Sequence, residues 1–141
     1  MKRICVIDGQ GGGIGSVIIK QLRAVFAEAI EIIALGTNAI ATAQMLKARA
    51  NRGASGSNAI IQTVKRVDLI IGPIGITMAH AMMGEVTPAI AEAVSSSPAK
   101  KILLPLTREN IEIVGTIPTP LPRLIETMIQ DNIQPIIKLD A

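Results

Sequence analysis

The sequence has almost no aromatic residues. Phe26 is the only one among its 141 residues, and tyrosine and tryptophan do not occur. Mechanisms that use a tyrosine as the proton donor are therefore excluded, as is stacking of single-stranded bases on aromatic side chains. Hydrophobic residues still make up 49% of the chain. The sequence therefore predicts a single domain, residues 1–141, with an aliphatic core.

Cysteine is equally rare, because Cys5 is the only one. This excludes disulfides within the chain and cysteine-based metal sites, and it is typical of the reducing cytoplasm. The longest uncharged stretch, Leu69–Met83, contains glycine and proline and is too short for a membrane span. The net charge is +3, but the basic residues are scattered, which disfavours a nucleic-acid surface. We expect a cytoplasmic protein with no metal site and no membrane or nucleic-acid partner.

Short apolar segments alternate with helical patterns along the chain. Lys2–Ile7, Ile30–Leu35 and Asp68–Ile71 are typical of buried strands, and apolar residues recur at helical spacing over Gly13–Ala27. This order predicts adjacent parallel strands joined by right-handed helical crossovers. We therefore expect a three-layer, Rossmann-like α/β fold with a mostly parallel sheet of about five strands.

Further helices are expected after the second and third strands. The first of these is expected to bury one face formed by Ala39, Ala43, Leu46 and Ala50. A short helix is expected within residues 58–67. Thr87 and Pro88 predict the N-cap and the first residue of another helix. The last helix is expected to bury Leu121, Leu124, Ile125, Met128 and Ile129.

The remaining segments are expected to be loops and edge strands. "NRGASGS", residues 51–57, is expected to be a flexible loop. "KILLPL" and "IEIVG" are two more expected strands, and the four polar residues "TREN" between them suit a hairpin. The sheet is therefore expected to end in an antiparallel edge.

The segment "DGQGGGIG", residues 8–15, directly follows the first expected strand and contains five glycines. Gly9, Gly13 and Gly15 satisfy the pattern G-x-x-x-G-x-G, and the chain continues into an amphipathic helix. Glycines let the backbone approach a phosphate closely, and a helix N-terminus supplies N–H donors. A plain strand-to-helix turn needs fewer glycines, so we favour phosphate or dinucleotide binding over a purely architectural turn.

Loops that follow parallel strands open on the same side of the sheet, where ligands bind. "GTN" after the second strand and "GPIG" after the third would join the first loop there. Residues 9–15 would hold phosphate, Thr37 and Asn38 would contact ribose or base, and "GPIG" would close the opposite wall. The expected cofactor-binding residues are Gly9, Gln10, Gly11, Gly12, Gly13, Ile14, Gly15, Thr37, Asn38, Gly72, Pro73 and Gly75.

The glycine pattern, over roughly the first 30 residues, resembles the cofactor loop of short-chain dehydrogenases. That resemblance implies dinucleotide binding. The Tyr-x-x-x-Lys catalytic pair of that family cannot exist in a chain without tyrosine. The second strand also ends in "LGTN", without the acidic residue that would hold an adenosine ribose. A redox enzyme of that family is therefore not expected.

A second resemblance extends further along the chain. The glycine loop, "GTN", "NRGASGSNA" and "DLIIGPIGITMAHAMMGEVTPAIAEAV" are similar in order to the nucleotide-binding domain of tubulin-like cell-division GTPases. "GPIGIT" departs from the glycine-rich phosphate signature of those proteins. The chain is also too short for the second domain that supplies their hydrolytic acidic residues. This resemblance implies nucleotide binding, without GTP hydrolysis or polymerisation.

The segments "IDGQGGGIG", "TNAIATAQMLKA" and "DLIIGPIGI" carry a third resemblance, which runs over nearly the full length. Through them the sequence resembles a bacterial family of short Rossmann-like proteins described as a domain of unknown function. This resemblance implies no activity, so function has to be inferred from the residues.

Three further features have alternative interpretations. Asp8 either accepts hydrogen bonds from N–H groups of the loop, which we favour, or holds Mg²⁺ beside a ligand. His80 is the only histidine, and without a neighbouring carboxylate or serine it is interpreted as structural rather than catalytic. Met78, Met82 and Met83 are expected in the core or at a subunit contact.

The predicted function is binding of a nucleotide or dinucleotide, either NAD(P) or a purine nucleotide, at the C-terminal edge of the sheet. The alternative is a non-catalytic, self-associating accessory protein whose glycine loop is architectural. The aliphatic excess and the uncharged stretch 69–83 predict a homo-oligomer in addition. No catalytic residue is assigned, and whether the protein is an enzyme stays open.

Overall fold

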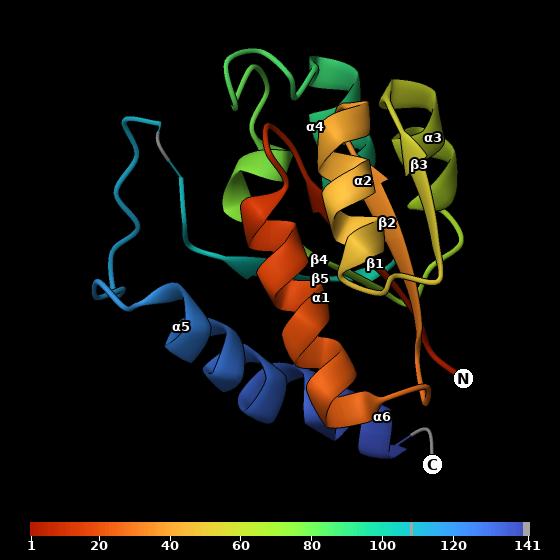
Figure 1. The fold of residues 1–141 in the computed structure, drawn as a ribbon. Helices are drawn as coiled ribbons and strands as arrows, with labels where there is room; N and C mark the ends of the chain where they lie inside the picture. Colours follow the sequence, from red (N-terminus) through yellow and green to blue (C-terminus); the bar gives the residue numbers. More distant parts are fainter. Residues whose placement is uncertain (108, 140–141) are drawn as a thin grey trace.

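The computed structural model describes residues 1–107 and 109–139, which form an α/β fold around one five-stranded sheet (Figure 1). The strand order is β3-β2-β1-β4-β5, and every pairing is parallel. The predicted adjacency of the first three apolar segments is confirmed, because β1 pairs with β2 on one side and with β4 on the other. The strands are β1 (Arg3–Asp8), β2 (Glu31–Gly36), β3 (Arg52–Ser55), β4 (Leu69–Pro73) and β5 (Lys100–Leu104).

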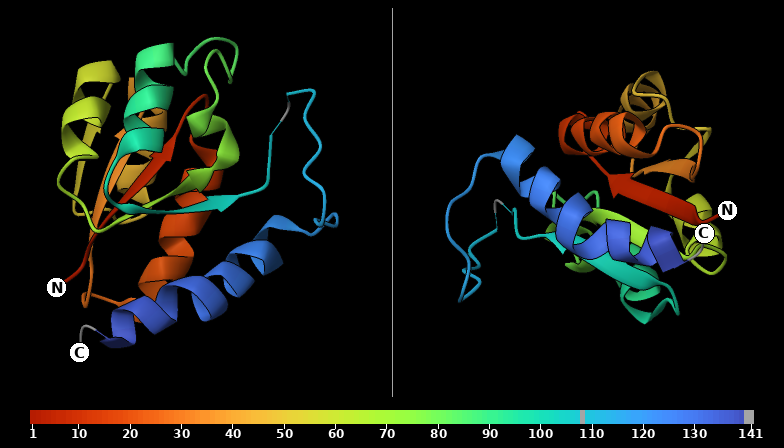
Figure 2. Two further views of the ribbon diagram at one scale, coloured as in Figure 1. Left: turned by 180° about the vertical axis from the view of Figure 1, so that it is seen from behind. Right: turned by 90° about the horizontal axis from the view of Figure 1, so that it is seen from below.

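Helices cover both faces of the sheet, which gives the Rossmann-like helix–sheet–helix arrangement (Figures 1 and 2). Side chains of a strand alternate between the two faces. In β1, Ile4 and Val6 therefore enter one apolar core while Cys5 and Ile7 enter the other. The first core is covered by α1 (Gly13–Phe26), α2 (Ala39–Lys47), α5 (Leu121–Met128), the π-helical turn η2 (Ile129–Ile133) and α6 (Gln134–Leu139). The second is covered by α3 (Ser57–Thr63), the 3₁₀ turn η1 (Ile74–Thr77) and α4 (Pro88–Ser96).

Two helices follow the sequence patterns closely. Thr87 caps α4, because its hydroxyl oxygen accepts a hydrogen bond from the Ile90 N–H at 3.2 Å. In α5 and η2, Ile125, Met128 and Ile129 are buried as predicted. The helix α2 was predicted, but the prediction of which of its faces is buried is wrong. The expected face of Ala39, Ala43 and Leu46 is exposed, and the residues that pack on the sheet are Ala41, Thr42, Met45 and Ala48.

The expectation of a flexible loop over residues 51–57 is wrong. Arg52–Ser55 forms the edge strand β3, in register with the β2 residues from Ile33 to Gly36. Nothing in this short, mostly exposed segment resembles a buried strand. It pairs because β2 has an otherwise unused edge whose backbone groups need partners.

The prediction of an antiparallel hairpin at the opposite side of the sheet, beside β5, is also wrong. β5 pairs with β4 in parallel, and the segment "IEIVG" (residues 111–115) forms no strand. Pro105 directly follows β5 and has no N–H to continue a ladder. Local turns take up the backbone instead, since the Ile111 N–H bonds the Glu109 carbonyl at 2.7 Å and the Thr116 N–H bonds the Ile113 carbonyl at 3.3 Å. Arg108 of the expected "TREN" turn lies outside the described residues.

Residues 105–107 and 109–120 contain no helix or strand, and they belong to the segment between β5 and α5 that runs away from the sheet (Figure 2). Three of its apolar side chains, those of Ile111, Val114 and Ile117, are exposed. Within residues 1–107 and 109–139, none of the helices has both the length and the apolar character that crossing a membrane requires.

Candidate functional site

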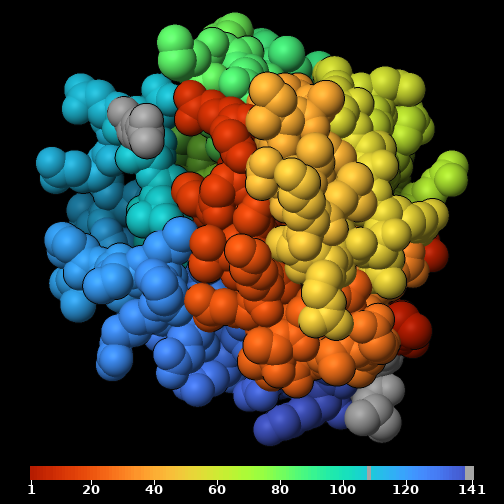
Figure 3. Space-filling model, in the orientation of Figure 1, coloured from red at the N-terminus to blue at the C-terminus, as the bar shows by residue number. Residues whose placement is uncertain are grey.

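A cavity of about 830 Å³ opens at the C-terminal edge of the sheet, beside the ends of β1 and β4. Crossovers on opposite faces of the sheet diverge there, and open α/β sheets bind ligands at such a point. Figure 3 shows the recess between the red glycine loop, the green segment after β4 and the teal segment after β5. It is lined by Asp8, Gly9, Gln10, Gly11, Gly12, Gly13, Ile14, Pro73, Gly75, His80, Ala81, Met82, Met83, Leu106, Thr107, Glu109 and Leu121.

Asp8 holds the glycine loop in place. Its carboxylate is buried, and it accepts hydrogen bonds from the Gly9 N–H at 2.8 Å and the Gly15 N–H at 2.7 Å. Burial raises the pKa of Asp8, and the hydrogen bonds from Gly15 and Gly9 offset only part of that rise. These contacts confirm the loop-bonding role that we favoured. They also use the Gly15 N–H, one of the free donors at the start of α1.

Three of the five loop glycines have a reason within the fold itself to be glycine. Gly12 has a left-handed backbone with φ of 73°, and a β-carbon there would lie 2.8 Å from the Ala41 carbonyl oxygen. At Gly15 a β-carbon would lie 2.5 Å from the Met45 sulfur, and at Gly9 it would lie 2.5 Å from the Thr37 hydroxyl oxygen. These are close approaches between the loop and α2, or between the loop and the end of β2. They need no ligand to explain them.

Gly11 and Gly13 are different. Neither has a left-handed backbone, and a β-carbon on either would meet no atom within 4 Å. Both are exposed and both line the cavity. Within the described residues their N–H groups have no hydrogen-bond partner. The backbone that begins the 14-residue helix α1 therefore presents open donors to the cavity.

The structure brings eight of the twelve predicted site residues together and leaves four outside the cavity. Gly9 to Ile14, Pro73 and Gly75 line it. Gly15 packs on Met45 instead. Gly72 is where β4 passes close to β1, since a β-carbon there would lie 2.5 Å from the Ile7 carbonyl oxygen. The other two residues outside the cavity, Thr37 and Asn38, are engaged by a residue that the sequence did not single out.

That residue is Glu85, which reaches from the segment after β4 to the end of β2. Its Oε1 accepts hydrogen bonds from the Thr37 hydroxyl at 2.6 Å, the Asn38 amide at 2.8 Å and the Gln10 N–H at 2.8 Å. Partial burial alone would raise the pKa of Glu85, but the bonds from Thr37, Gln10 and Asn38 together hold it below its ordinary value. Asn38 also caps α2 by accepting from the Ala41 N–H at 2.9 Å. Glu85 therefore ties three loops together.

Residues 80–83, in the turn after β4, line the cavity together with the glycine loop. His80, Met82, Met83 and Gly84 all have left-handed backbones, with φ of 70°, 58°, 57° and 89°. For residues other than glycine this region is uncommon and costs free energy. A tight turn over the cavity is therefore held in place by its surroundings, among them a bond from the Met82 N–H to the Glu109 carboxylate at 3.3 Å.

The wall residues that the sequence analysis missed are mainly apolar. Met82, Met83, Leu106 and Leu121 line the cavity, and Met83 is 93% exposed at its rim, so it is not a core residue. The His80 imidazole has no hydrogen-bond partner in the part of the chain that the structure describes. No three metal-ligating side chains cluster within residues 1–107 and 109–139. The arrangement combines an apolar cleft with free backbone donors at one end, which suits binding of a partly polar small molecule.

Comparison with known proteins agrees with this architecture. The model of a family described as "Domain of unknown function (DUF3842)" matches residues 3–137. Curated protein sequences give no match. The fold is similar to that of apo histidine-tagged saccharopine dehydrogenase (L-Glu forming) from Saccharomyces cerevisiae, with 14% sequence identity and a TM-score of 0.50. The similarity covers 87% of this chain but only 23% of the dehydrogenase chain, and at this identity it shows a Rossmann-like fold alone.

Proposed function

We propose that this chain, which belongs to the DUF3842 family, binds a nucleotide or dinucleotide, with phosphate on the backbone of Gly11 and Gly13. One observation carries the proposal. The fold gives neither glycine a conformational or steric reason to be glycine, yet both line the cavity at the start of α1. A β-carbon at either position would stand between the backbone and a bound phosphate. Glycine removes that obstacle.

The remaining walls suit the other parts of such a ligand. Met82, Leu106 and Leu121 offer apolar surface to a base or a nicotinamide ring. No lysine or arginine lines the cavity among the described residues, so the donors for phosphate are N–H groups and the dipole of α1. NAD(P) and purine nucleotides are the ligands that we propose.

We propose binding without assigning a reaction. The titratable side chains along the described cavity wall are Asp8, His80 and Glu109. Asp8 is committed to the loop, and Glu109 to the Met82 N–H. His80 has no partner that would orient it as a general base. We therefore propose that His80 and the methionines shape the cavity.

The test is native mass spectrometry of freshly purified protein, followed by calorimetry with NAD, NADP, ATP and GTP. We expect at least one of them to bind with a dissociation constant of about 100 µM or tighter, which corresponds to about 5.5 kcal/mol. A co-purified mass equal to a nucleotide would identify the ligand directly. If the protein carries no ligand and binds none of the four, the proposal fails.

A second candidate function is self-association as a non-catalytic accessory protein, and the exposed segment after β5 favours it. Val114 and Ile117 are 99% and 80% exposed, and Met83 stands exposed at the cavity rim. Clustered exposed apolar side chains mark contact surfaces in other proteins. Light scattering at micromolar concentration is expected to give at least a dimer mass, and the double substitution Val114→Ser with Ile117→Ser is expected to lower it. If the parent and the double variant are both monomers, this candidate function is wrong.

A further inference from the structure

The end of β2 acquires a carboxylate that its own sequence lacks. β2 ends in Gly36 and is followed by Thr37 and Asn38, so no acidic residue follows it directly. Glu85 fills the gap from the turn after β4, with its Oε1 2.6 Å from the Thr37 hydroxyl and 2.8 Å from the Gln10 N–H. In Rossmann-like dinucleotide sites, a carboxylate at this place accepts hydrogen bonds from ribose hydroxyls.

Only one of the two Glu85 oxygens is used. Oε1 accepts all three hydrogen bonds, while Oε2 has no partner within residues 1–107 and 109–139. Gln10, which holds Oε1, directly precedes Gly11, where we propose that the phosphate binds. The carboxylate is therefore fixed in place next to the phosphate site and keeps an unused acceptor. Such a group can accept a hydroxyl that a ligand brings with it.

No lysine or arginine among residues 1–107 and 109–139 is paired with Glu85. Lysine and arginine are absent from residues 5–19, 24–46 and 67–99, which include the ends of β1, β2 and β4 and the loops after them. The hydrogen bonds to Glu85 lower its pKa, so it is ionised at neutral pH. A second negative group placed beside it would be repelled, and no basic side chain of the strand ends and loops named above offsets the repulsion.

We propose that Glu85 binds the ribose of a dinucleotide and selects an unmodified ribose over a 2′-phosphorylated one. This rests on the proposed function. The sugars of a dinucleotide lie on both sides of its diphosphate. With the diphosphate on Gly11 and Gly13, one half occupies the cavity and the other half extends over Gln10 toward Thr37 and Glu85. The protein therefore takes NAD and rejects NADP.

The test compares NAD and NADP binding by calorimetry in the parent protein, Glu85→Gln and the control Glu126→Gln. Glu126 is exposed on α5 and outside the cavity, so its substitution makes the same charge change elsewhere. The parent is expected to bind NAD about tenfold or more tighter than NADP. Glu85→Gln is expected to bring the two affinities to within about threefold, and Glu126→Gln to keep the parent's preference. If Glu85 had only a structural role, Glu85→Gln would weaken the binding of NAD and NADP equally and leave the ratio of the two affinities unchanged.

A second measurement needs no variant, so it serves where Glu85→Gln does not fold. Raising the salt from about 0.05 M to about 0.5 M screens the repulsion, so the parent's preference for NAD is expected to shrink. Equal binding of NAD and NADP by the parent, or a preference for NADP, overturns the inference and leaves the proposed function intact. Binding of ATP or GTP, with no binding of NAD or NADP, also overturns the inference and leaves the proposed function intact. Binding of none of the four overturns both.

Discussion

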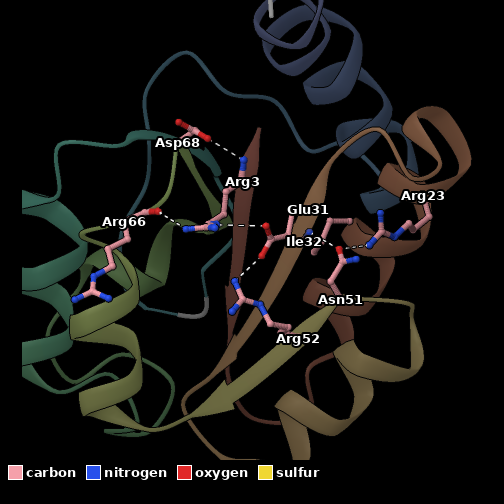
Figure 4. A network of polar contacts seen from close by, with 8 residues as sticks. All are labelled: Arg3, Arg23, Glu31, Ile32, Asn51, Arg52, Arg66 and Asp68. Carbon is pink, nitrogen blue, oxygen red and sulfur yellow. Dashed lines mark hydrogen bonds and ion pairs between the residues drawn. The ribbon is translucent and has the colours of Figure 1, made fainter. Parts of the chain in front are cut away.

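The two ends of the parallel strands, here called the N-terminal and the C-terminal edge of the sheet, differ in how their polar groups are paired. At the N-terminal edge, both oxygens of Glu31 are paired: Arg3 Nε lies 3.4 Å from one, and Arg52 Nη2 lies 2.5 Å from the other. The Asp68 carboxylate accepts from the Arg3 N–H at 2.8 Å (Figure 4). Arg23, which is buried there, donates to three backbone carbonyls and to Asn51.

At the C-terminal edge several groups have no partner within the described residues: the N–H groups of Gly11 and Gly13, the second oxygen of Glu85 and the His80 imidazole. Non-glycine residues with a left-handed backbone also gather there, namely His80, Met82 and Met83. Buried polar groups of native proteins are paired within the protein, whereas exposed groups such as those of Gly11, Gly13 and His80 can bond to water or to a ligand. The difference therefore locates the place where a ligand can supply the missing partners.

The largest effect is expected from breaking the N-terminal edge. Arg23→Met would leave the carbonyls of Ala27, Ile30 and Arg49 without their donor. We expect a loss of about 3 kcal/mol in the free energy of unfolding, measured with urea. The control is Arg52→Met, whose side chain is 62% exposed and which is expected to cost less than about 1 kcal/mol. Equal losses for both would contradict the view that this edge is fastened by buried bonds.

A smaller loss is expected from the architectural glycines of the opposite edge. Gly12→Ala forces a left-handed alanine and brings its β-carbon against the Ala41 carbonyl. We expect it to cost about 2 kcal/mol of unfolding free energy. Gly11→Ala, one residue away, is expected to stay within about 0.5 kcal/mol of the parent. If both variants were equally unstable, the division between architectural and open glycines would be wrong.

Much of the fold could be predicted because the central strands are continuous apolar runs followed by glycine. β4 is fully buried, and β1 and β2 are buried on both faces after their first residue; such strands have a clear sequence pattern. The segments at the two lateral sides of the sheet lack that pattern. Arg52–Ser55 is a strand through its pairing with β2, whereas the alternating residues 111–115 have no neighbouring strand to pair with. In α2, alanines at several spacings left the buried face ambiguous.

The site was predictable only where local chemistry marks it. The glycine loop and Pro73 could be found because glycine permits unusual backbone conformations and proline fixes φ, and both mark the end of a strand. Glu85 carried no such signal. It is one acidic residue in a turn, and only the fold brings it to Thr37 and Asn38, 48 and 47 positions away in the sequence. The fold also showed that Gly15 and Gly72 serve packing.

A still smaller effect on stability is expected from the exposed ion pairs of the N-terminal edge. The hydrogen bond from Arg52 is the main cause that lowers the pKa of Glu31. A lowered pKa in the folded state means that ionised Glu31 stabilises the fold above its ordinary pKa. This contribution is lost as the pH falls through the lowered pKa. The free energy of unfolding of the parent is expected to exceed that of Glu31→Gln by less than about 1 kcal/mol at pH 7, and the gap is expected to narrow as the pH falls toward about 3.

The contribution of Asp8, at the C-terminal edge, to the free energy of unfolding has the opposite pH dependence. Burial raises its pKa in the folded state, so its protonated form favours folding. That contribution is present at low pH and is lost as the pH rises through the raised pKa. Glu31→Gln keeps Asp8 but lacks the Glu31 contribution, so acid should lower its free energy of unfolding, measured with urea, less than it lowers that of the parent. A gap between parent and variant that stays constant from pH 7 to pH 3 would contradict the assignment for Glu31.

The smallest change in stability and the most direct test come from Gly13. Gly13→Val puts bulk where the structure has open space, so we expect the free energy of unfolding to stay within about 0.5 kcal/mol of the parent. Calorimetry with NAD, NADP, ATP and GTP is expected to show a loss of about tenfold or more for whichever ligand binds the parent, about 1.4 kcal/mol. Gly13→Ala is the milder variant and is expected to lose less affinity, with unchanged circular dichroism. If folded Gly13→Val binds that ligand as tightly as the parent does, phosphate does not bind at the start of α1 and the central claim is wrong.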